Sequence, residues 1–309
     1  MKFYKLFYKL IMRKYKKSKP KNIYKKKTSK LINKLILKKK RKKKLILATQ
    51  VGRGGGKWLC DILNTIENIS AYGERNSIDE SIFRYKRSHS IKSHDNKILK
   101  LIKTEALSDW ERNDLSYISS PYFSHGISFL DFKLKPQKIV IIVASPLRVL
   151  TSLKNKGWYN FTEKIRLDKP LKKIPKKFKS KGNHFYGRML NFDKYNKDFY
   201  NLTQIGKIIL FMSQTIEKIY NELKKIKKRN IVVFHLDKSD QNYNYCKKFI
   251  NKLGYDLKIS KKQFLQLKKR TSYKFENKKI SFNKNEVIEY KKYKKKYLIY
   301  LNKILKLSL

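Results

Sequence analysis

The residues best suited to chemistry lie in one glycine-rich segment, QVGRGGGK. Glycine has no Cβ, so Gly54, Gly55 and Gly56 are free to take positive φ and to point several N–H groups at one anion. Arg53 and Lys57 add a positive charge at each end of the glycines. This combination predicts a site for a phosphate or sulfate group, although a glycine turn by itself fits a tight connection equally well.

The elements around the glycines predict that this site stands between a strand and a helix. Leu45–Thr49 is an apolar run of strand length, and a helix is expected from Trp58 onward. The amino terminus of a helix offers unpaired N–H groups and a partial positive charge to an anion. The loop is not a Walker A motif, which requires glycine where this chain has Val51, and it is not a GxGxxG motif.

A second strand, turn and helix follow later in the chain. Lys138–Val143 is an apolar run of strand length, and a helix is expected from Pro146 onward. Ser145 is a favourable N-cap, and proline is a favourable first helical residue because its missing N–H would be unpaired there. Arg148 and Ser152 lie four positions apart and therefore share one face of the helix.

Together these segments resemble the sulfotransferases that use 3′-phosphoadenosine 5′-phosphosulfate (PAPS). Arg53–Leu59 lies over the family's first loop, K/R-S/T-G-T/S-T/S-W/F-L, and Ala144–Ser152 lies over its second motif, R-x-P-x-x-V-x-x-S. Ser119–Phe123 is similar to the family's S-P-x-Y/F stretch, and Asn230–Asp237 with Phe249–Gly254 to its late strand, acidic turn and helix end. The resemblance implies an α/β fold with a mainly parallel central sheet, helices on both faces and a P-loop-like sulfotransferase architecture.

The resemblance also implies roles for the residues of the first loop. The N–H groups of Gly54–Gly56 and Lys57 would hold the 5′ phosphosulfate of PAPS. Arg53 would stabilise charge on the leaving oxygen, because sulfuryl transfer resembles phosphoryl transfer in its loose transition state. Trp58 would stack on adenine or pack in the core. The product of the donor would be 3′-phosphoadenosine 5′-phosphate (PAP).

Two departures from the family pattern leave activity open. Ala144 stands where the family has the arginine that grips the 3′-phosphate, and Gly56 and Lys57 stand where it has hydroxyl residues. Arg148 and Ser152 are the expected substitutes, with further candidates in a later loop: Lys268, Lys269 and Arg270. A catalytically impaired relative is therefore an alternative. A nucleotide-dependent phosphotransferase is a weaker one, because no acidic Mg²⁺ ligand follows the second strand.

The general base implied by the resemblance is Glu74, which matches a glutamate of many glycan-modifying members. It would take the proton from an acceptor hydroxyl, and the resemblance implies that this hydroxyl belongs to a carbohydrate. Without the resemblance, a lone glutamate in a loop is expected to be solvated. His125 is a further candidate for the pocket wall, whereas the other histidines lack partners at metal-ligand spacing. No metal site is predicted.

The formal net charge of +55 opens a second class of function. Such a surface binds nucleic acid and other polyanions, or an anionic membrane surface, with strong salt dependence. Residues 1–44 contain no acidic residue, and Lys38–Lys44 is an unbroken basic run. Against this, lysine is spread over the whole chain together with many Asn, Ile and Tyr residues. All four have A/T-rich codons, so genome composition explains the charge without a partner.

Length and composition set the outer limits. The 309 residues fit one domain, 45–309, after a Lys-rich extension, 1–44, that is flexible or helical. Cys60 and Cys246 are isolated, which favours a reducing compartment. The apolar runs are shorter than the roughly 20 residues of a transmembrane helix. A cytoplasmic location is expected, with peripheral membrane contact as an option.

The remaining pattern predicts further elements of a parallel sheet. Strands are expected at Ile98–Ile102, Leu115–Ile118 and Ile231–Phe234, although the first also fits a helical turn. Helices are expected over residues 202–228, 243–253 and 285–305. Residues 160–183 read as an irregular loop that either closes over an acceptor or is a solvated connection.

Overall fold

The computed structural model describes residues 43–159, 199, 201–239, 242–270 and 281–307. These residues belong to one compact unit that begins at Lys43. The expected basic extension, up to residue 42, and the expected loop over residues 160–183 lie outside the described residues.

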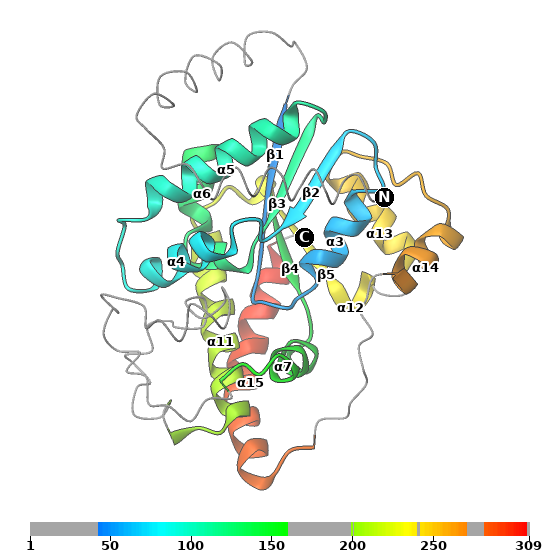
Figure 1. Ribbon diagram of the computed structural model, residues 1–309. Coiled ribbons are helices and arrows are strands. Elements are labelled where there is room, and N and C mark those ends of the chain that lie inside the picture. Colours follow the sequence, from blue (N-terminus) through cyan, green and yellow to red (C-terminus); the bar gives the residue numbers. More distant parts are fainter. Residues whose placement is uncertain (1–42, 160–198, 200, 240–241, 271–280, 308–309) are drawn as a thin grey trace, which may run out of the picture. The chain divides into compact units, whose positions relative to one another are not determined.

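A five-stranded parallel sheet forms the centre of the fold, in the order β2-β3-β1-β4-β5 (Figure 1). The strands are β1 (Lys44–Gln50), β2 (Ile69–Gly73), β3 (Leu115–Ser119), β4 (Lys138–Val143) and β5 (Ile231–His235). In the central strand β1, Ala48 pairs with Ser119 of β3 and with Val140 of β4. Almost every side chain of β1 is buried, as expected for a strand covered on both faces.

Helices cover both faces of the sheet, so the predicted α/β class is confirmed (Figure 1). One face carries α3 (Gly56–Leu63), α13 (Tyr243–Lys252) and α14 (Lys261–Arg270), and α14 contacts α3. The other face carries α5 (Asp95–Trp110) and α11 (Gln204–Leu223). The chain changes face after β2 because right-handed crossovers in opposite directions across a sheet place their helices on opposite sides.

Shorter elements and a long final helix complete the described chain. The shorter elements are α4 (Ser77–Ser88), η1 (Pro121–His125), α6 (Ile127–Leu134), α7 (Pro146–Asn155), η3 (Lys228–Asn230) and α12 (Leu236–Ser239). The final helix is α15 (Lys284–Lys306), which packs against α11. The five predicted helices therefore exist as α3, α7, α11, α13 and α15, with ends that differ by a few residues. None of the described helices combines the length and apolarity needed to cross a membrane.

One prediction about these elements is wrong, and one strand was not predicted. Ile98–Ile102 is not a strand but part of α5, where Ile98, Ile102 and Ala106 are buried one turn apart on the same face. The alternative of a helical turn is thus confirmed. The strand that was not predicted is the edge strand β2, which begins at Ile69, after α3 ends at Leu63. Glu74 consequently follows the end of a strand.

Candidate active site

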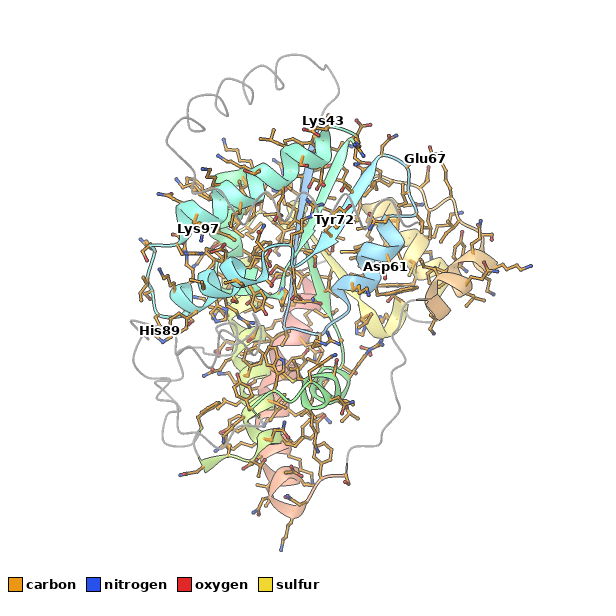
Figure 2. The ribbon with its side chains drawn as sticks, in the orientation of Figure 1. Lys43, Asp61, Glu67, Tyr72, His89 and Lys97 are labelled. Atoms are coloured by element: carbon orange, nitrogen blue, oxygen red, sulfur yellow. The ribbon has the colours of Figure 1, made fainter. Side chains whose placement is uncertain are left out.

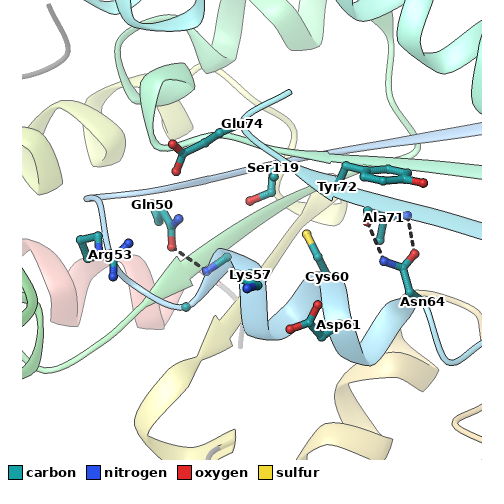
Figure 3. Close-up of a pocket in the computed structure, with 13 residues that line it drawn as sticks. Gln50, Arg53, Lys57, Cys60, Asp61, Asn64, Ala71, Tyr72, Glu74 and Ser119 are labelled. Carbon is teal, nitrogen blue, oxygen red and sulfur yellow. Dashed lines mark hydrogen bonds between the residues drawn. The ribbon is translucent and has the colours of Figure 1, made fainter. Parts of the chain in front are cut away.

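A pocket of about 470 Å³ lies at the carboxyl ends of β1, β2 and β3, beside α3 (Figure 3). This is the edge of a parallel α/β sheet where ligands usually bind. The loop after β1 forms one end of the pocket with Arg53, Gly55 and Lys57. Asp61 on α3 and Tyr72 on β2 line the other end, and both side chains are labelled in Figure 2. The predicted glycine loop therefore faces a real pocket.

The loop has the strained backbone expected of a glycine turn, but not at the expected residues. Of the three glycines, only Gly55 has positive φ, at 99°, and Gly52 and Arg53 are left-handed as well, at 126° and 52°. Gly56 is required for a different reason, because its surroundings leave no room for a side chain. A Cβ at Gly56 would stand 2.7 Å from Gln50 Nε2 and 3.0 Å from Ser119 Oγ. The expectation of positive φ at Gly54 and Gly56 is thus wrong.

The amino terminus of α3 directs its first N–H groups toward the loop. The first intrahelical bond is the one in which the Leu59 N–H donates to the Gly55 carbonyl, so the amides of Gly56, Lys57 and Trp58 precede it. Gly55 is the N-cap and provides no side-chain cap. These donors, next to the positive end of the helix dipole, suit a bound anion.

One of these amides is already used by a residue that the sequence interpretation did not single out. The Gly56 N–H donates to Gln50 Oε1 at 3.0 Å, and Gln50 lines the pocket (Figure 3). The carboxamide oxygen of Gln50 occupies the position that an anion oxygen needs to reach the Gly56 N–H. A ligand that uses this amide must displace Gln50, at the cost of about one hydrogen bond.

Arg53 connects the loop to the second predicted motif. Its Nε–H donates to Ser152 Oγ of α7 at 3.2 Å, although the two residues are 99 positions apart. Arg53 and Lys57 are both exposed and both line the pocket. Lys57 also lowers the pKa of Asp61, which burial raises more strongly. The loop end of the pocket is therefore cationic, as predicted.

Glu74 lines the same pocket as Arg53 (Figure 3). It has a left-handed backbone, with φ of 54°, and its N–H donates to the Ser119 carbonyl at 2.9 Å. Burial raises the pKa of Glu74, and the Arg53 guanidinium partly offsets this rise. A half-buried carboxylate with a raised pKa is a suitable general base. The two residues predicted to be catalytic are thus brought to one pocket.

The residues after Glu74 are fixed by buried carboxyl groups behind the pocket. Arg75 donates to Asp109 Oδ1 at 2.6 Å and stacks on the Tyr72 ring at 3.7 Å. Asn76 donates its N–H to Glu80 Oε1 at 3.2 Å. Each of these contacts holds the turn that gives Glu74 its left-handed backbone.

Two carboxyl groups at this turn, those of Glu80 and Glu105, have pKa values that burial raises to near or above neutral pH. Burial raises the pKa of Glu80 to about 8, although Ser120 Oγ, at 2.7 Å from Glu80 Oε2, and the Asn76 N–H favour the carboxylate. Burial likewise raises the pKa of Glu105, the hydrogen-bond partner of the Asn76 side chain, to about 7. The turn therefore depends on the protonation state of its supports.

In the second motif Ser145 is the N-cap of α7 and Pro146 is its first residue, as predicted, but Arg148 and Ser152 do not reach the pocket. Ser145 does not cap α7 with its side chain. Instead, Asp237 accepts from the Ser145 N–H at 2.7 Å and from Arg148 at 3.4 Å. A carboxylate of the chain itself thus occupies the amino terminus of α7, and neither Arg148 nor Ser152 lines the pocket. Ala144 is buried, and its carbonyl accepts from the Tyr297 hydroxyl at 3.0 Å.

The other candidate residues lie away from the pocket. Trp58 is buried and packs edge-on against Phe264, with ring centroids 5.4 Å apart, so it occupies the core as the second interpretation expected. His125 is buried and does not line the pocket. Lys268 belongs to helix α14 rather than to a loop, and the side chains of Lys269 and Arg270 lie outside the described residues.

The pocket contains no other obvious reactive group. Cys60 lines it, but burial raises the pKa of this thiol far above its ordinary value, which disfavours a thiolate nucleophile. Within the described ranges, no three His, Cys, Asp or Glu residues are grouped so as to hold a metal ion. The geometry is that of a polar pocket with a cationic anion-binding end and two carboxylates, Glu74 and Asp61, whose pKa values burial raises.

Comparison of the sequence with protein-family models and with curated proteins gave no match.

Proposed function

We propose that this protein transfers a sulfuryl group from PAPS to a hydroxyl of an acceptor, with a carbohydrate as the expected acceptor class. The observation that carries the proposal is that Arg53, the loop amides and Glu74 line one pocket. An anion-binding end and a carboxylate base are the two parts that this reaction requires, and both match positions that the family resemblance assigns to Arg53 and Glu74.

The residues fit one end of PAPS and not the other. The amides of Gly55, Gly56 and Lys57 suit the 5′ phosphosulfate. At the 3′-phosphate, the family's arginine is replaced by the buried Ala144, and Arg148 is engaged with Asp237. This mismatch favours a second candidate function: a relative of the same fold that binds the nucleotide weakly and has lost activity.

In the proposed reaction each side chain has a defined task. Bound PAPS would supply a sulfuryl group attached to a phosphate leaving group. The Glu74 carboxylate would accept the proton of the acceptor hydroxyl as its oxygen forms the new bond to sulfur. The Arg53 guanidinium and the Lys57 ammonium would stabilise the negative charge that develops on the leaving oxygen. No covalent intermediate with the protein is required.

Calorimetric titration with PAP at two salt concentrations tests the proposal. We expect PAP to bind at both concentrations and Arg53→Ala to weaken that binding about tenfold, as for the loss of one charge-assisted hydrogen bond. Arg112→Ala, which removes an exposed arginine outside the pocket, is the matched control and should bind PAP like the wild type.

Two other results would separate the alternatives. Binding of PAP, ATP and random-sequence nucleic acid that all disappears at the higher salt concentration would contradict the proposal and support a polyanion-binding protein. Salt-resistant binding of PAP without transfer of labelled sulfate to any hydroxyl acceptor would support the inactive relative. Glu74→Gln should retain PAP binding while it abolishes transfer.

A further inference from the structure

Ser119, the last residue of β3, has a buried hydroxyl that the fold leaves unpaired. Its side chain is 1% exposed and lines the pocket, yet its Oγ has no hydrogen-bond partner among the described residues. Two neighbouring serines behave differently. Ser116 Oγ donates to Asp109 at 2.6 Å, and Ser120 Oγ donates to Glu80 at 2.7 Å. The fold thus provides hydrogen-bond partners for the hydroxyls of Ser116 and Ser120, but not for that of Ser119, which lines the pocket.

Tyr117, two residues earlier on the same strand, is a polar group that could compete for the Ser119 hydroxyl. Burial raises the pKa of Tyr117 well above its ordinary value, and the Ser119 hydroxyl offsets a small part of this rise. The two groups are therefore near one another. Neither oxygen, however, has a partner in hydrogen-bond geometry among the described residues. Tyr117 does not account for the position of the Ser119 hydroxyl.

Ser119 lies between the anion-binding loop and the proposed base. Its Oγ stands 3.0 Å from the point where a Cβ of Gly56 would be, so it lies against the first residue of α3. Its carbonyl accepts from the Glu74 N–H at 2.9 Å. In the view of Figure 3 the Ser119 side chain lies between those of Gln50 and Tyr72, which line the same pocket.

We propose that the Ser119 hydroxyl binds the tetrahedral oxyanion held by the loop, as a further hydrogen-bond donor beside the amides at the start of α3. On the loop side, the groups near this position are donors or cations, namely the Gly56 and Lys57 amides, Arg53 and the Lys57 ammonium, whereas the carboxylates of Glu74 and Asp61 line the rest of the pocket. A sulfate or phosphate group offers only acceptor oxygens, and it is therefore the ligand class that satisfies all of these donors at once. Gln50 Oε1 accepts from the Gly56 N–H in the free protein, and one oxygen of the bound anion would take its place.

This inference deepens the proposed function and rests on it only for the identity of the donor nucleotide. Inorganic pyrophosphate tests the oxyanion site without any nucleotide, and PAP tests the nucleotide. In calorimetric titration of the full chain, we expect Ser119→Ala to weaken the binding of pyrophosphate about tenfold or more. Because the lost hydroxyl is unpaired in the free protein, the thermal midpoint of Ser119→Ala should be equal to or above that of the wild type.

Two matched variants control for the loss of a hydroxyl. Thr49→Val removes another buried, unpaired hydroxyl that does not line the pocket, and Tyr117→Phe removes the competing group. Both should bind pyrophosphate like the wild type. Ser119→Ala with wild-type affinity, or with a loss that either control reproduces, would overturn the inference.

The two proposals fail in distinguishable ways. If the wild type binds pyrophosphate but not PAP, and Ser119→Ala weakens the former, the oxyanion site stands and the proposed donor is wrong. If Arg53→Ala weakens PAP binding and Ser119→Ala changes neither ligand, the function stands and the role of Ser119 is refuted. A wild type that binds neither ligand refutes both.

Discussion

Glu80 makes the stability of this protein depend on pH in an unusual direction. The side chain is 2% exposed, and its pKa is raised from 4.5 to about 8 by burial. In the folded chain Glu80 is therefore protonated at neutral pH, whereas in the unfolded chain it is ionised. The unfolded state binds fewer protons than the native state between these two pKa values, so the free energy of unfolding must fall as pH rises.

The size of this effect follows from the same two values. The slope is about 1.4 kcal/mol per pH unit, and the window spans about 3.5 units, from pH 4.5 to pH 8. The total is roughly 3–5 kcal/mol, lost progressively as pH rises through the window. Glu105, with a pKa of about 7, adds an effect of the same sign.

Glu80→Gln isolates this contribution. The amide keeps an oxygen for the Asn76 N–H and places an NH₂ group beside Ser120 Oγ, so that the serine oxygen accepts there instead of donating, and the amide cannot ionise. We expect the variant to match the wild type near pH 5 and to exceed it at pH 8, by a thermal midpoint roughly 5–10 °C higher. Glu67→Gln, on the exposed turn before β2, controls for the loss of one carboxylate (Figure 2).

Thermal unfolding at pH 5, 6.5 and 8 provides the measurement. If the midpoints of Glu80→Gln and the wild type run parallel across this range, Glu80 is ionised in the native state. In that case its hydrogen bonds outweigh the cost of burial, and the reasoning is wrong.

Three further predictions concern the pocket and its loop. Arg53→Ala should raise the pKa of Glu74 further, because a cation that stabilises the carboxylate is lost; a ¹³C-carboxyl NMR titration with an unchanged or lower midpoint would refute this. Gln50→Ala should tighten pyrophosphate binding about fivefold, since an amide is released for the anion, and weaker binding would show that the carboxamide is itself a ligand. Gly55→Ala should destabilise the fold by roughly 2–5 kcal/mol in denaturant titration, because φ is 99° and a leucine methyl would lie 2.5 Å away. Gly157→Ala, with φ of 66° and open space around it, should lose only about 1–2 kcal/mol, and equal losses would contradict the steric argument.

The sequence was sufficient for the parts of the fold that local pattern decides. β1, β4 and β5 are continuous apolar runs of strand length, and such runs are what a sheet buried on both faces requires. β2, with the sequence ISAYG, is a short edge strand without such a run and was missed. Ile98–Ile102 has the right composition for a strand, but burial one turn apart makes it helical.

The candidate site was predictable where residue type indicates chemistry or where the family resemblance supplies a role. Arg53 and Lys57 were found from their charges beside the glycines, whereas Glu74 was found only through the resemblance. Gln50 and Ser119 were not proposed as site residues, because what matters is which polar atom remains paired or unpaired after the chain has folded. A polar residue at the end of a strand beside the glycine loop was the only signal for either of them.

The pairing of Arg148 with Asp237 was likewise invisible, since the partners are 89 residues apart and come together only when β4 and β5 pair. A sequence pattern records that an arginine is present on a helix face. The pattern does not show whether this arginine is paired with a carboxylate from a distant part of the chain.

The contact between Gly55 and Leu236 has a consequence for how this chain can change over generations. The leucine side chain lies where any substituent on residue 55 would have to go, and the backbone of residue 55 is left-handed. A mutation at 55 is therefore tolerable only after position 236 has become smaller, and only toward residues that accept positive φ. In descendants of this sequence, substitutions at positions 55 and 236 should occur together, while the exposed lysines around them vary independently.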